Sequence, residues 1–74
     1  MNAWELKANQ KGRIKWVEDL SPTIQQRLID LGFAVGETIL CVKIPPFNGP
    51  RMFQNSHGIY SIEQEVARCI GVEI

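Results

Sequence analysis

The sequence predicts a mainly β fold with one inserted helix, in which five short strands curl into a small antiparallel barrel. The first observation is a set of five short segments with the composition or apolar alternation of strands. The second is a single amphipathic segment, which follows the first strand and begins with a helix start signal. The third is that no second full-length helix pattern occurs, although a ferredoxin-like α+β sandwich would need one. Closure of the barrel would leave no sheet edge unpaired.

The length and composition suit one small domain over residues 1–74. The chain has 74 residues, near the lower limit for a self-supporting core, and 45% of them are hydrophobic, which argues against disorder. No apolar run is long enough to span a membrane, and residues 1–5 do not resemble a signal peptide. We therefore expect a cytoplasmic protein.

The net charge and the number of cysteines argue against nucleic-acid-binding proteins, disulfide-rich proteins and zinc-knuckle proteins. Eight basic and eight acidic residues give a net charge of zero, so nucleic-acid binding is not expected. Two cysteines are too few for a disulfide framework or a zinc knuckle, and we expect both to be reduced.

The first strand, residues 12–18, alternates with Ile14 and Trp16 on one face, and Val17 breaks the alternation where a bulge would fit. Residues 4–6 are expected to form an extended lead-in, and residues 63–68 a single helical turn. The other predicted strands are residues 37–44, 51–55, 59–62 and 69–74, the last with Ile70, Val72 and Ile74 on one face.

The predicted helix begins at Ser21-Pro22, because the serine can cap a free N–H and the proline has no N–H to leave unpaired. Ile24, Leu28 and Leu31 then fall on one face. A helix of about ten residues is unstable alone, so we expect it to pack on the sheet.

Two glycines mark the bends between this helix and the next strand. Gly32 directly follows the last apolar residue of the helix, where a left-handed cap favours glycine. Gly36 follows Val35, as in a turn whose third position needs a positive φ. Asn9, which tolerates the same geometry, predicts a turn before the first strand.

This hinge carries a resemblance to the FeoA family, small proteins that accompany the FeoB ferrous-iron transporter. The family pattern Arg-Leu-x-x-Leu-Gly-x-x-x-Gly occurs here as Arg27-Leu28, Leu31-Gly32 and Gly36. The central loop, residues 45–50, lacks the family's acidic residue, and Glu63 stands where a basic residue is usual. Further apolar positions match over nearly the whole chain, namely Leu6, Ile14, Ile62, Ala67, Ile70 and Val72.

The resemblance implies an SH3-like barrel with an inserted helix, and structural roles for Leu28, Leu31, Gly32, Gly36 and Ala67. It also implies a non-enzymatic accessory protein of ferrous iron uptake that binds the cytoplasmic side of a FeoB-like transporter and modulates it. The alternative is a transition-metal-responsive module like the C-terminal domain of iron-dependent repressors. That alternative would require a preceding DNA-binding helical domain, which this sequence does not contain.

The residues themselves do not favour catalysis or a metal centre. His57 lies in a predicted hairpin turn, and no nucleophile has a base at a recognisable spacing. Cys41, His57 and Cys69 are the soft or borderline ligands, but Cys41 fits a strand core and the two thiols are expected on opposite faces. We predict no cofactor and no metal site, although weak transition-metal binding is compatible with the sequence.

A partner surface is predicted near the proline-rich loop, at Phe47, Met52 and Phe53, although alternation can send only one of the last two inward. Phe47 either faces solvent or folds back to plug the barrel. On the helix, Arg27 and Asp30 are three residues apart and can pair or contact the partner. The same loop could join two copies into a homodimer.

Overall fold

The computed structural model describes residues 1–74, and all five strands form one antiparallel sheet. The mainly β fold with one main helix is confirmed. In space the strands follow the order β4-β3-β2-β1-β5. The elements in chain order are the 3-10 helix η1 (Ala3–Glu5), β1 (Lys11–Val17), α1 (Pro22–Asp30), β2 (Thr38–Lys43), β3 (Arg51–Gln54), β4 (Ile59–Ile62), α2 (Gln64–Ala67) and β5 (Ile70–Glu73).

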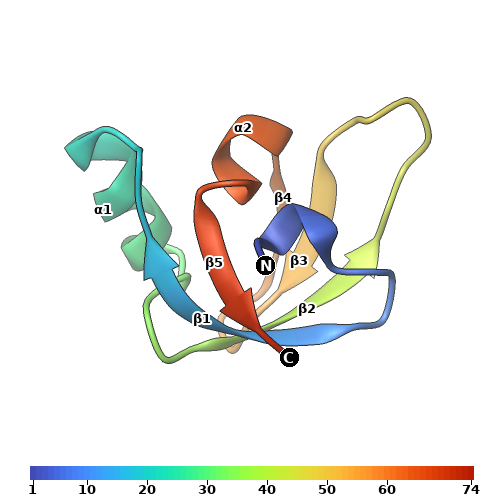
Figure 1. The fold of residues 1–74 in the computed structure, drawn as a ribbon, viewed down its shortest axis with the longest axis horizontal. Helices are drawn as coiled ribbons and strands as arrows, with labels where there is room; N and C mark the ends of the chain where they lie inside the picture. Colours follow the sequence, from blue (N-terminus) through green and yellow to red (C-terminus); the bar gives the residue numbers. More distant parts are fainter.

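The sheet curls strongly but does not close, as Figure 1 shows. β4 and β5 are the two edge strands, and the short helix α2 connects them. Full closure, which the sequence predicted, is therefore wrong. The N-terminal segment covers the β5 edge instead, because Val72 N donates to the carbonyl oxygen of Met1 at 2.9 Å and Asn2 forms a bridge with Gly71.

The core lies inside the curl and receives a side chain from every strand. Phe33, from the hinge after α1, is completely buried beside them. The buried hydrophobic residues are Ala3, Trp4, Leu6, Ile14, Leu28, Phe33, Ile39, Cys41, Phe53, Ile62, Ala67, Ile70 and Val72.

The N-terminal residues form η1, where an extended lead-in was expected. Glu5 explains the difference, because its carboxylate accepts a hydrogen bond from Asn2 N at 2.8 Å and its N–H donates to Asn2 O at 3.0 Å. Arg51 of β3, 47 positions further along the chain, then stabilises this turn by direct contact. Its guanidinium lies 3.9 Å from the centroid of the Trp4 ring and donates to the Trp4 carbonyl oxygen.

Helix α1 stands beside the sheet and is only partly packed against it (Figure 1). Its start is as predicted, since Ser21 Oγ accepts a hydrogen bond from Ile24 N at 3.3 Å. Leu28 is its one buried residue, whereas Ile24 is 38% exposed and Ile29 is 51% exposed. The expected apolar stripe is thus only partly buried, because the curled sheet fills its own interior and the helix contacts it mainly near its C-terminal end.

The predicted bends are confirmed, with a φ of 97° at Gly32, 94° at Gly36 and 67° at Asn9. The single turn predicted for residues 63–68 is α2. Ile74, expected on the buried face, is 72% exposed, because the last strand ends at Glu73.

A bulge in the β1–β5 pairing lies between Ile14 and Trp16, close to the predicted place. It turns Trp16 out of the core, so the indole is 44% exposed and covers Gly71. A Cβ added at Gly71 would lie 1.9 Å from Cε2 of that ring, so only glycine fits under it.

We predict that Gly71→Ala lowers the free energy of unfolding by about 1–3 kcal/mol, because the indole must leave its place. Chemical denaturation followed by Trp fluorescence measures this change. The matched control is Gly49→Ala, whose added Cβ meets nothing closer than 3.5 Å. Equal stability of the two variants would contradict the packing described for Trp16.

Candidate interaction surface

Asn55 joins the β3–β4 hairpin to the end of α1. Its side chain is only 8% exposed, and its Nδ2 donates to the carbonyl oxygen of Leu31 at 2.9 Å. Its Oδ1 accepts from His57 N at 2.7 Å and from Gly58 N at 3.1 Å, while its backbone N–H donates to Gly58 O. One carboxamide therefore shapes the hairpin turn and caps a carbonyl at the helix end.

Gly32 allows this junction to close. A Cβ there would lie 2.5 Å from His57 Nδ1 and 3.0 Å from Asn55 Nδ2. Glycine is thus required for its positive φ and for the close approach of the hairpin. His57 itself is an exposed turn residue, with its Nδ1 at 3.1 Å from Ser56 Oγ.

The junction holds α1 beside β4 and leaves a groove of about 510 Å³ between them. The lining is mostly apolar, and Tyr60 packs edge-on against Phe33 with ring centroids 5.8 Å apart. Arg27 and Glu63 are the charged residues of the lining. We call this the α1–β4 groove, and its full lining is Ile24, Arg27, Leu28, Leu31, Tyr60, Ser61, Ile62, Glu63 and Val66.

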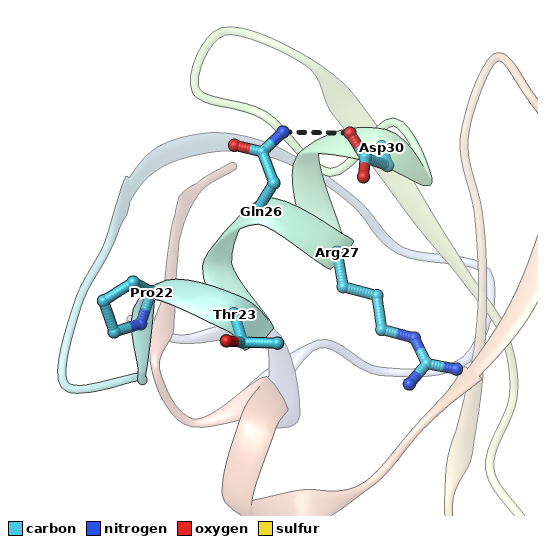
Figure 2. Close-up of a pocket in the computed structure, with 5 residues that line it drawn as sticks. All are labelled: Pro22, Thr23, Gln26, Arg27 and Asp30. Carbon is cyan, nitrogen blue, oxygen red and sulfur yellow. Dashed lines mark hydrogen bonds between the residues drawn. The ribbon is translucent and has the colours of Figure 1, made fainter.

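The opposite flank of α1 is polar (Figure 2). Asp30 accepts a hydrogen bond from Gln26 Nε2 at 2.9 Å, and Arg27 extends away from both. The predicted Arg27–Asp30 pair does not form, because Gln26 satisfies the carboxylate from one turn earlier. Arg27 and Asp30 nevertheless line one polar hollow, together with Pro22, Thr23 and Gln26. Arg27 also lines the α1–β4 groove.

Phe47 is 96% exposed, so it does not plug the barrel. Its φ of 64° is rare for a bulky side chain, and Asn48 follows with a φ of 57°. Met52 is half-buried on β3. Phe53 is completely buried opposite Cys41, so it belongs to the core and not to the predicted partner surface.

The two cysteines are free and differ in environment. Burial raises the pKa of Cys41, and the nearby Arg51 charge opposes that rise. Burial also raises the pKa of Cys69, and the negative charges of Asp19 and Glu18 add to the shift. A raised pKa keeps both thiols protonated and weakly nucleophilic at neutral pH. No group of three or more His, Cys, Asp or Glu side chains that could hold a metal ion comes together in the structure.

The curled five-stranded sheet with its inserted helix defines a class of small SH3-like domains, and solved structures share the whole arrangement. Iron(II) transport protein A from Clostridium thermocellum superposes with a TM-score of 0.93 and 27% identity. The present chain is covered over 100% of its length, but it spans only 45% of the Clostridium chain. The FeoA protein from Chlorobium tepidum gives a TM-score of 0.91 and 26% identity over 100% of this chain and 70% of its own.

A third similar structure is FeoA from Stenotrophomonas maltophilia in complex with zinc. It is 26% identical, covers 99% of this chain and 89% of its own, and has a TM-score of 0.85. It is described as a prokaryotic SH3 domain protein and is suggested to be a ferrous iron transport activating factor. A model of the FeoA domain matches residues 1–74 of the present sequence. The chain belongs to the FeoA family.

Other comparisons are less informative. A manganese-dependent transcriptional repressor shares 14% identity with a TM-score of 0.86, which shows the fold alone. No curated protein matches the chain. None of its helices has both the length and the apolar composition needed to cross a bilayer.

The sequence did not indicate the part played by Asn55 or the groove. The one available signal was an asparagine in front of Ser-His-Gly, the composition of a side-chain-stabilised turn. The contact of its amide with Leu31 could not be inferred, because the two residues are 24 positions apart.

We predict that Asn55→Ala lowers the free energy of unfolding by about 2–4 kcal/mol, because it leaves the Leu31 carbonyl and two turn N–H groups without partners. Urea denaturation followed by circular dichroism measures this loss. Ser56→Ala, an exposed neighbour in the same turn, should change stability by less than about 0.5 kcal/mol. A similarly small effect for Asn55→Ala would refute the junction.

Proposed function

We propose that this protein is a non-enzymatic accessory factor of ferrous iron uptake that binds the cytoplasmic portion of a FeoB-like transporter and modulates it. Family membership supports the connection with iron transport. The binding role rests on one structural observation, the exposure of Phe47.

Phe47 lies in a left-handed backbone conformation and is almost fully exposed, a combination that weakens the fold. A bulky residue at positive φ costs about 1–2 kcal/mol, and an exposed aromatic ring recovers none of this by burial. Strain of this kind is characteristic of residues that act on a ligand or partner. Exposed aromatic side chains are also the anchors that protein interfaces favour.

The binding surface that we propose contains Phe47 and the half-buried Met52, and it is assisted by Arg27. Phe53 is excluded by its burial. Asp30, on the polar flank of α1, is a secondary candidate. Self-association into a homodimer through the Phe47 loop and weak binding of a transition metal stay predictions.

We predict that Phe47→Gly weakens binding of the transporter's cytoplasmic portion by about tenfold or more, because the anchor is removed. Its free energy of unfolding should stay the same or rise by up to about 1 kcal/mol, since glycine adopts the left-handed conformation without a steric cost. Isothermal titration calorimetry and urea denaturation measure the two quantities.

The matched control is Asn48→Gly, which relaxes the neighbouring left-handed residue and keeps the aromatic ring. This variant should bind like the wild type. Failure of the wild-type protein to bind the cognate FeoB portion would refute the proposed function, and equal binding by Phe47→Gly would remove Phe47 from it.

A further inference from the structure

One edge of the sheet is covered by backbone pairing and the other is not. The β5 edge is covered by Met1 and Asn2 through the hydrogen bond to Val72 and the bridge to Gly71. β4 pairs with β3 alone. The hydrogen bonds formed outside the strand ladders include none to the backbone of residues 59–62. The outer side of β4 is therefore open.

The hairpin geometry shows which groups are free. Asn55 N donates to Gly58 O, so this pair is a hydrogen-bonded pair of the antiparallel ladder. Hydrogen-bonded and non-hydrogen-bonded pairs alternate along such a ladder. Tyr60, opposite Phe53, is then hydrogen-bonded to β3. Ile59 and Ser61 consequently direct their N–H and C=O groups away from β3.

No feature of β4 blocks a further strand. Proteins commonly protect an edge with charged residues, proline or a bulge, but β4 reads Ile-Tyr-Ser-Ile and its pairing with β3 is regular. Tyr60, Ser61 and Ile62 of β4 line the α1–β4 groove. Ile24 and Leu28 of α1 and the following Leu31 face them. A row of free backbone groups thus lies along an apolar groove.

The groove also contains the positive charge of Arg27. Arg27 is exposed and lines the groove, and neither Arg27 nor Glu63 forms a salt bridge within the chain. A guanidinium without a carboxylate partner beside apolar side chains favours a ligand that supplies a carboxylate. An extended segment with alternating apolar residues and one Asp or Glu would satisfy the edge, the groove and Arg27 together.

We propose that the transporter portion binds by adding such an extended acidic–apolar segment as a sixth strand along β4, with its carboxylate on Arg27. The mode is strand addition, in which backbone hydrogen bonds hold the segment and the groove selects its side chains. This inference rests on the proposed function and identifies the recognition element within the partner.

The test compares Ser61→Pro with Ser61→Ala. Proline removes the outward N–H of Ser61 and fills its place with a ring, but takes no hydrogen bond from the β3–β4 ladder. Calorimetric titration with the cytoplasmic portion of the cognate FeoB transporter should show binding weakened about tenfold for Ser61→Pro relative to Ser61→Ala, which keeps the backbone N–H. Circular dichroism verifies that both variants are folded. Equal binding by the two overturns strand addition and leaves the proposed function intact, whereas absence of wild-type binding overturns both.

A second pair of variants does not alter any strand. Arg27→Gln and Gln26→Glu each change the net charge by one unit on adjacent exposed positions of α1, but only Arg27 lines the groove. Arg27→Gln should weaken binding severalfold, and Gln26→Glu should not. Equal effects overturn the assignment of a carboxylate to Arg27. Sedimentation equilibrium tests whether a second copy of the chain occupies the β4 edge instead. A wild-type dimer that Ser61→Pro dissociates would show that β4 pairs with a second copy, and would overturn the proposal.

Discussion

The hydrogen bonds of the Asn55 carboxamide are the interactions on which the placement of α1 beside the β3–β4 hairpin depends. The carboxamide is a buried polar group whose donor and acceptor are both used, one on the helix end and the other on the hairpin turn. Because α1 has a single buried side chain of its own, Leu28, this hydrogen bond and the close approach at Gly32 fix where the helix stands. The groove lies between the two elements that this contact joins, since its lining comes from α1, β4 and α2.

Signals between neighbours in the sequence predicted a good part of this fold. The cap at Ser21 and the left-handed bend at Gly32 depend on local backbone chemistry, and both are present. The contacts that the sequence did not reveal join residues remote in sequence: Asn55 with Leu31, Arg51 with Trp4, and Met1 with Val72 at the β5 edge. No alternation pattern contains such pairs, which is why closure was expected and the covered β5 edge was not.

The candidate site could be predicted only in part: the sequence singled out the Phe47 loop but not the groove. The sequence left open whether Phe47 faces solvent or plugs the barrel, and the structure decides for exposure. Alternation sends only one of Met52 and Phe53 inward but does not show which. Phe53 is the inward residue because it pairs with the buried Cys41. The groove beside β4 was not predictable, since it depends on how the helix is placed after the Asn55 contact forms. The Phe47 loop and the groove meet at Glu63, which lines the groove and also a hollow with Asn48 and Pro50 of the loop.

The most direct test of this account is to map the contact surface on the isotope-labelled protein. Amide chemical shifts and hydrogen exchange would be followed by NMR while the cytoplasmic portion of the cognate FeoB transporter is added. The account predicts that the affected amides cluster at Phe47 and along β4 and the facing side of α1, with slowed exchange at Ile59 and Ser61. Changes confined to β1 and the covered β5 edge, with Ile59 and Ser61 exchanging as in the free protein, would contradict it.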